Sequence, residues 1–203
     1  MPTSTLAAAR IDDWLERLST PVPEPGGGEA AGVVIATGAA LVAMAAGYAL
    51  PGEQRDAALE VAARARREAL IGAEHDGRMS AALVAAFRRP LDDAGRDGAV
   101  REATVRAAQS GAALVAIAAG LEGTLAWLEH AGEPRLAPDV AVAARMLACG
   151  IRSTAVNIRC NVTSAIEAGA DAETAHRLQA ALDEAHAAAA RLDACAERVT
   201  KTL

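Results

Sequence analysis

The sequence has few aromatic side chains and almost no lysine. Of its 203 residues, 2% are Phe, Trp or Tyr, and Lys201 is the only lysine. A mechanism that needs an interior lysine as base or Schiff-base partner is therefore excluded. Nucleic acid is not an expected partner either, because the net charge is −6 and the chain has neither a basic stripe nor a series of stacking aromatics.

Cysteine is scarce as well, with three residues in the chain. Cys149 and Cys160 fall on one predicted helix, where they would lie about 16 Å apart, too far for a disulfide. We expect these two and Cys195 to be small buried hydrophobic side chains in a reducing compartment. The first residues become charged before an apolar run is long enough for a signal peptide, so the sequence predicts a cytoplasmic protein.

Hydrophobic residues make up 52% of the chain, and the strong helix formers Ala and Leu dominate them. This composition predicts an all-α fold, a single-domain bundle of about six or seven helices over residues 1–203. The expected helices span 4–18, about 29–50, 53–90 with an interruption near Gly77, about 100–131, about 138–168, and from Asp171 nearly to the C-terminus.

The last of these helices carries a regular apolar seam, whose members follow one another at spacings of four and three. They are Leu178, Leu182, Ala185, Ala189, Leu192, Ala196 and Val199. A heptad seam of this kind predicts a long packing partner, either an antiparallel helix of the same chain or a helix of a second subunit.

The longest uncharged run follows a loop of prolines and glycines, in "PVPEPGGGEAAGVVIATGAALVAMAAGYAL" at 21–50. From Ala30 to Leu50 it is long enough to cross a membrane. It is nevertheless rich in Ala and Gly, and no Lys or Arg flanks it to orient a span. We expect a central buried helix whose glycines let neighbouring helices approach closely, and no membrane partner; a membrane anchor is the alternative.

The three glycines Gly26, Gly27 and Gly28 stand just before this apolar helix. They let the backbone approach another group closely, and the helix start offers unpaired N–H groups with a partial positive charge. No Gly-Lys-Ser/Thr follows and no strand precedes, so neither a Walker loop nor a Rossmann turn is indicated. The sequence leaves two interpretations open, a ligand-binding helix start and a flexible turn.

A metal site is not expected. The two units that resemble di-iron ligand motifs, Glu173-x-x-His176 and Asp183-x-x-His186, lie on the same predicted helix. A di-iron site takes such units from different helices, together with further acids.

The helix at about 138–168 carries a polar line on an apolar background, formed by Ser153, Asn157, Asn161 and Ser164. Buried amides are costly without hydrogen bonds, so these residues form either an interhelical ladder or the wall of a polar pocket. Both interpretations stay open. Two acids are candidates for chemistry: Asp139 at the start of this helix and Asp76 beside His75, although each residue taken singly is more often structural.

Taken in order, four segments resemble the cyclodeaminase/cyclohydrolase family, which comprises the C-terminal domain of formimidoyltransferase-cyclodeaminase and its free-standing bacterial relatives. "PEPGGGEAAGVV" is similar to the family's T-P-G-G-G-S loop and long small-residue helix. "DGRMSAALVAAFRRP" at 76–90 is similar to D-x-x-A-F followed by A-A-Y-R-x-P. "GEPRLAPD" at 132–139 and "NIRCN" at 157–161 are similar to G-N-P-N-A-x-S-D and N-V-R-x-N.

This resemblance implies an all-helical homodimer that acts on a folate-type small molecule. The expected reaction is that of formimidoyltetrahydrofolate cyclodeaminase or methenyltetrahydrofolate cyclohydrolase, at the one-carbon bridge between N5 and N10. Neither reaction needs a metal or another cofactor, since the tetrahydrofolate derivative is the substrate. Both pass through a tetrahedral carbon between two nitrogens and need a proton shuttle.

On the same resemblance, the backbone of Gly26, Gly27, Gly28 and Glu29 lies against the folate. The side chains of Asn157 and Asn161 hydrogen-bond its pterin or amide.

On this resemblance, Asp139 or Asp76 transfers the proton during the reaction, and the Arg159 side chain binds a glutamyl carboxylate of the folate.

This sequence departs from the family pattern at the expected site. Glu29 stands where the family has a small hydroxyl residue, and Glu133, Arg135 and Pro138 replace two asparagines and a serine of the second loop. Ser80 replaces an aromatic residue after Asp76. The alternative function is therefore a catalytically altered or inactive helical dimer that serves as an interaction module.

Overall fold

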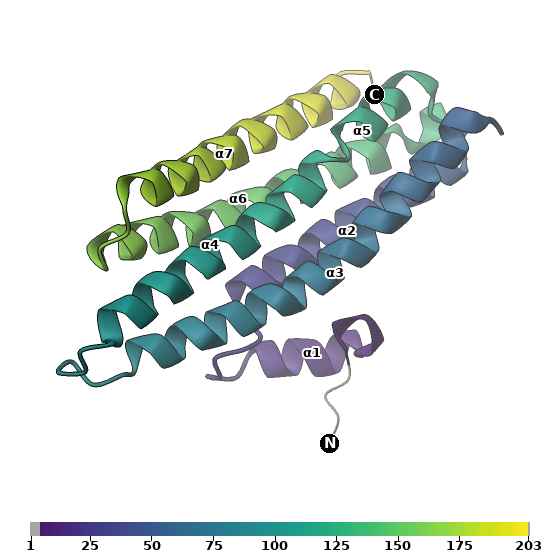
Figure 1. The fold of residues 1–203 in the computed structure, drawn as a ribbon. Helices are drawn as coiled ribbons and strands as arrows, with labels where there is room; N and C mark the ends of the chain where they lie inside the picture. Colours follow the sequence, from purple (N-terminus) through teal and green to yellow (C-terminus); the bar gives the residue numbers. More distant parts are fainter. Residues whose placement is uncertain (1–4, 203) are drawn as a thin grey trace.

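The computed structural model describes residues 5–202 and consists of helices, with no strand in that range. Its α-helices are α1 (Ile11–Leu18), α2 (Gly27–Gly47), α3 (Glu53–Phe87), α4 (Arg96–Ala119), α5 (Glu122–Ala131), α6 (Ala137–Glu167) and α7 (Ala172–Thr200). Two short 3₁₀ helices, η1 (Leu6–Ala8) and η2 (Pro134–Leu136), precede α1 and α6. The long helices form an elongated bundle, with α1 against the side of α2 and α3 (Figure 1). This is the all-α bundle that the composition predicts.

The uncharged run forms α2, which packs against both α3 and α6. Small residues make these contacts possible. A Cβ atom at Gly32 would lie 2.6 Å from Ala73 Cβ of α3, and one at Gly38 would lie 2.9 Å from Leu147 Cγ of α6. The prediction of a central helix with close neighbours is confirmed at these two positions. Gly47, by contrast, has open space around it.

The apolar seam of α7 is buried along its whole length, with Leu178 4% and Val199 2% exposed at its two ends. Its partner is α6, which runs antiparallel to it after the short connection 168–171. Asp171 caps α7 as expected, because its carboxylate accepts a hydrogen bond from the Thr174 amide at 2.7 Å. The apolar seam of α7 is thus buried by a helix of the same chain.

Four helix boundaries differ from the sequence-based prediction. The first helix begins at Ile11, because Ala9 and Arg10 are extended and η1 packs separately on α3. The second helix ends at Gly47 instead of Leu50.

The other two differences concern glycines. Residues 53–87 form one continuous helix, so Gly77 does not interrupt it. The predicted helix at 100–131 is divided into α4 and α5 by a turn at Gly120 and Leu121. Complete burial of Leu121 and Leu125 holds α5 in its own direction.

The expectation of three buried cysteines is wrong for two of them. Cys149 and Cys160 are exposed on α6, and Cys195 alone is buried. The helical periodicity explains the difference, since the side of α6 that faces the core is formed by Leu147, Ile151 and Ile158.

Two segments are long and apolar enough to cross a membrane by length and composition, Gly27–Gly47 and Arg96–Ala131. In the bundle, half of the most apolar window of α2 is buried against other helices. A core helix of a water-soluble protein meets the same criteria of length and hydropathy.

We expect Gly32→Ala to destabilise the bundle by about 1–3 kcal/mol. The new methyl group would meet Ala73 Cα at 3.0 Å and the Ala69 carbonyl oxygen at 3.3 Å, which are backbone atoms that cannot rotate away. Urea denaturation measures the change. Gly47→Ala is the matched control in the same helix and should be neutral or stabilising, since no atom lies within 4 Å of its Cβ position. An equal loss in both variants would contradict the close α2–α3 contact.

Candidate functional site

Three of the predicted site residues meet where α2 begins. A Cβ atom at Gly28 would lie 1.8 Å from Asp76 Oδ2 and 3.2 Å from Asn157 Nδ2. The same position at Gly27 lies 4.0 Å from Asn157 Nδ2. The absence of a side chain at Gly28 therefore makes room for a carboxylate from α3, beside an amide from α6. We call Gly27, Gly28, Asp76 and Asn157 the glycine–acid site.

The local sequence explains why this site forms. Gly26 is the extended residue before the first turn of α2, so the first amides of α2 have no partner within the helix. Asp76 projects toward them from the middle of α3, because the small-residue contact of Gly32 with Ala73 brings the two helices together one turn away. The contact between Gly32 and Ala73 thus accounts both for the close packing of α2 on α3 and for the position of Asp76.

Asp76 is 6% exposed, Asn157 is half-buried and Gly27 is exposed. Burial raises the pKa of the Asp76 carboxyl above its ordinary value, and the nearby Glu29 raises it further. The Ser110 hydroxyl of α4 and His75 act in the opposite direction. Burial favours the protonated form of such a carboxyl, and a carboxyl that can give and take a proton can act as a general acid or base.

Ser110 also lies beside Asp76, and the sequence analysis did not indicate it. It is 5% exposed, and its hydroxyl does not reach hydrogen-bond geometry with any described residue. It lies close enough to Asp76 to favour the charged carboxylate. A serine within an apolar helix gives no signal of its own, so only the packing of α4 against α3 reveals it.

Glu29 is buried on the other side of the same helix start. Its Oε1 atom accepts a hydrogen bond from Trp14 Nε1 at 2.7 Å, which ties α1 to α2. Its Oε2 atom lies 2.5 Å from the position of a Cβ atom at Gly77. Burial raises the pKa of the Glu29 carboxyl, while the bond from Trp14 lowers it.

A polar pocket of about 300 Å³ opens next to Glu29. Its charged residues are two acids besides Glu29, Glu24 and Glu74, and two arginines, Arg17 and Arg78. Arg78 lies 4.0 Å from Glu74, and Glu74 also accepts a hydrogen bond from the Leu6 amide.

The polar line of α6 is partly buried, with Asn161 and Ser164 half-buried and Ser153 exposed. Asn161 lies one turn beyond Asn157 on the same face, so it can extend the wall of the glycine–acid site. Arg159 is exposed and stands two residues from Asn157, on another face of the helix. It is not brought into the site.

Asp139 lies in the first turn of α6 and is half-buried. It is 18 residues before Asn157, a distance of about 27 Å along the helix. The structure therefore separates the two acids that the sequence singles out. Nearby Glu133 and Arg135 form an exposed ion pair of 2.8 Å in η2, also remote from Gly28.

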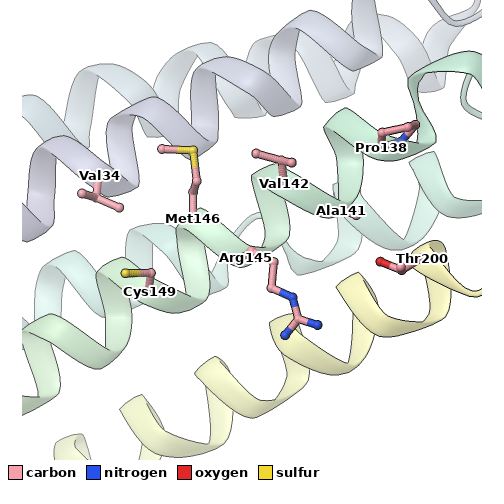
Figure 2. Close-up of a pocket in the computed structure, with 8 residues that line it drawn as sticks. All are labelled: Val34, Pro138, Ala141, Val142, Arg145, Met146, Cys149 and Thr200. Carbon is pink, nitrogen blue, oxygen red and sulfur yellow. The ribbon is translucent and has the colours of Figure 1, made fainter.

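A second, apolar groove of about 610 Å³ lies on the other face of α6, between α2 and the end of α7 (Figure 2). Val142, Met146 and Cys149 line it from α6, and Val34 lines it from α2. Arg145 also lines the groove and extends toward α7 in Figure 2, where it binds Asp193 at 2.9 Å. The groove carries no charged pair suited to proton transfer.

The stability of the bundle should decrease as the pH rises, through Asp76. Because its folded-state pKa is raised, folding favours the protonated carboxyl, so its contribution is fully present below the ordinary pKa and is lost as the pH rises through the raised pKa. Carboxyls with lowered pKa values, such as Asp193, act only in the acid range. We expect the urea midpoint of the wild type to fall from pH 5 to pH 8.

The drop should be smaller in Asp76→Asn, whose side chain does not ionise. Urea denaturation of both proteins at the two pH values measures it. An equal drop in the two proteins would contradict the raised pKa of Asp76.

Comparison with known proteins identifies the family. The family model described as formiminotransferase-cyclodeaminase matches residues 10–184, so the chain belongs to this family. The fold is similar to the crystal structure of a formiminotetrahydrofolate cyclodeaminase from Thermotoga maritima, with a TM-score of 0.82 and 21% sequence identity. That match covers 98% of this chain and 97% of the other. A search of curated protein sequences gives no match.

Proposed function

We propose that the chain acts on the one-carbon bridge between N5 and N10 of a tetrahydrofolate derivative, as a formimidoyltetrahydrofolate cyclodeaminase or a methenyltetrahydrofolate cyclohydrolase. Family membership supports the substrate class. The observation that carries the proposal is the buried Asp76 carboxyl held against Gly28, next to the Asn157 amide. This arrangement combines a proton-carrying group, open backbone amides and an amide side chain at one helix start.

The two candidate reactions make the same demands on these groups. In the deamination, N10 attacks the formimidoyl carbon and loses its proton, and the departing nitrogen gains a proton and leaves as ammonia. In the hydrolysis, water adds to the methenyl carbon and loses a proton, and one ring-bridge nitrogen is protonated as its bond to carbon breaks. Asp76 would carry the proton in either case.

The remaining groups would bind and orient the substrate. Gly26, Gly27 and the amide of Glu29 offer N–H groups at the start of α2, and Asn157 with Asn161 would hydrogen-bond the pterin or its amide. An exposed Arg159 could meet a glutamyl carboxylate only at the outer edge of this site. No metal or additional cofactor enters these steps.

The test is the absorbance of the methenyl bridge with the wild-type protein. Formation of methenyltetrahydrofolate from the formimidoyl compound indicates deamination, and its consumption indicates hydrolysis. Absence of both would contradict the proposed activity. The variant Asp139→Asn tests which of the two acids, Asp76 or Asp139, transfers the proton. We expect its turnover to stay near that of the wild type, because Asp139 lies far from Asn157.

The alternative function is an interaction module without catalysis, and Glu29 favours it. An acid at this helix start opposes the binding of an anionic ligand group. Calorimetry with tetrahydrofolate derivatives separates the two functions, since a pure interaction module should give no heat of binding.

We further propose that the protein is a soluble cytoplasmic homodimer. The apolar groove of Figure 2 supports a second copy as partner, because Val142 in it is 49% exposed and Val156 on the same helix is 50% exposed. We expect a dimer in light scattering without detergent. Val142→Glu should shift it toward the monomer, whereas Glu102→Gln on α4 should not. A monomeric wild type would contradict the homodimer.

A further inference from the structure

Two consecutive residues of α2 and two of α3 fit together reciprocally. In α2 the order is Gly28 then Glu29, and in α3 it is Asp76 then Gly77. Asp76 Oδ2 occupies the space over Gly28, at 1.8 Å from its Cβ position, and Glu29 Oε2 occupies the space over Gly77, at 2.5 Å. Each glycine thus makes room for the carboxyl of the other helix, and two acids are buried on either side of one helix contact.

The groups around these acids do not neutralise two negative charges. Around Glu29, the cations are Arg17 of α1 and Arg78 of α3, which is itself paired with Glu74, and the further acids are Glu24 of the preceding loop and Glu74 of α3. Trp14 donates its N–H to Glu29.

Around Asp76, the groups are His75 of α3, Ser110 of α4 and the amide of Asn157 of α6. Glu29 itself acts on Asp76 as a like charge. Two carboxylates that are both buried at one helix contact, each over a glycine next to the other acid in sequence, resist ionising at the same time.

We propose that Glu29 and Asp76 form a coupled carboxyl pair that holds one proton between them, and that Glu29 is the positioning residue that keeps Asp76 in its acid form. The inference about catalysis rests on the proposed function, whereas the pairing itself does not.

The pair suits a reaction that takes a proton from one nitrogen or water and gives one to another nitrogen. With one proton on two carboxyls, Asp76 can start as the acid, lose its proton to the leaving nitrogen and regain a proton afterwards. The carboxyl of Glu29 does not touch the substrate in this scheme, and only its backbone amide does. The carboxyl acts through its charge, which makes the ionised state of Asp76 less favourable.

The direct test is a carboxyl ¹³C NMR titration of the full chain, assigned with Glu29→Gln and Asp76→Asn. In the wild type we expect two linked steps shared by both carboxyls. In Glu29→Gln, Asp76 should titrate in one step at lower pH, because the like charge is gone. The Gln carbonyl can still accept the bond from Trp14. Independent titration in the wild type, or an unchanged Asp76 midpoint in the variant, would overturn the pair.

Turnover supplies the second readout. The alkaline limb of the pH–rate profile, on which the acid form of Asp76 is lost, should move to lower pH in Glu29→Gln. At pH 7, kcat should fall about 10-fold with little change in KM. Glu102→Gln, an exposed acid paired with Arg106, is the matched control and should leave the profile unchanged. An unmoved limb in Glu29→Gln would overturn the catalytic part.

The two proposals fail in different ways. A wild type without turnover would contradict the proposed function, and the NMR titration would still decide the pair. If Glu29→Gln does not fold, Glu29→Ser, which removes the carboxyl and leaves a smaller polar side chain, provides the same comparison.

Discussion

Asp76→Asn is expected to lower methenyl-bridge turnover by about 10²–10⁴-fold. The asparagine side chain would have the same shape as that of Asp76 and could occupy the same space over Gly28, but it could neither give nor take a proton. Asp76 is 6% exposed, and burial already raises the pKa of its carboxyl, so the substitution does not remove a charge that the fold needs. A steady-state absorbance assay measures the effect, and circular dichroism checks that the helices remain.

The split between kcat and KM makes this result specific. The loss should fall mainly on kcat, because Asn157 and the amides at the start of α2 still bind the substrate. Asp183→Asn is a suitable control, since Asp183 is an exposed acid on α7 that binds only Gln179 among the described residues. Normal turnover in Asp76→Asn would assign the proton transfer to another group.

Gly28→Ala is expected to lower turnover by about 10²-fold, because the new methyl group displaces the Asp76 side chain. A methyl group there would lie 1.8 Å from Asp76 Oδ2, a distance that no pair of unbonded atoms adopts. The Asp76 side chain has to rotate out of its place, and Asn157, at 3.2 Å, has to move with it. Because the contact is with a side chain, the helix itself should persist, and the catalytic geometry should be lost before the fold.

Two neighbours of this position provide a graded comparison. Gly27→Ala should have a small effect, because the nearest atom, Asn157 Nδ2, lies 4.0 Å from its Cβ position. Gly47→Ala, at the other end of α2, should have none on turnover. Equal losses in Gly27→Ala and Gly28→Ala would mean that the loop backbone, and not the placement of Asp76, is what the substitution disturbs.

Much of the fold followed from local patterns. The seam from Leu178 to Val199 predicted a long buried contact, and Asp171 predicted the start of α7, because both depend on spacing and capping within one helix. The break at Gly120 was missed, because a glycine does not by itself end a helix: Gly77 lies within α3 and Gly111 within α4. The difference between these glycines and Gly120 depends on which residues the neighbouring helices bury, and Leu121 is buried completely.

The candidate site was predicted in part. Motif order singled out Gly28, Asp76 and Asn157, and these three do meet. The same reasoning gave Asp139 as the alternative proton carrier and Arg159 as the partner of a glutamyl carboxylate. On α6, Asp139 lies in the first turn, far from Asn157, and Arg159 lies on another face than Asn157. A motif match identifies residue types in order along the chain and contains no information about which ends of two helices lie together.

The amino-acid sequence by itself determined the helical class, the order of the elements and the small residues that allow close contact, because these follow from propensity, periodicity and side-chain size. The tertiary structure alone decided that Gly28 and Gly77 each face a carboxyl of the other helix, and that Trp14 and Ser110 complete the surroundings of the two acids. Such contacts join residues that are far apart along the chain, and the relative rotation of packed helices, which no local pattern specifies, sets them.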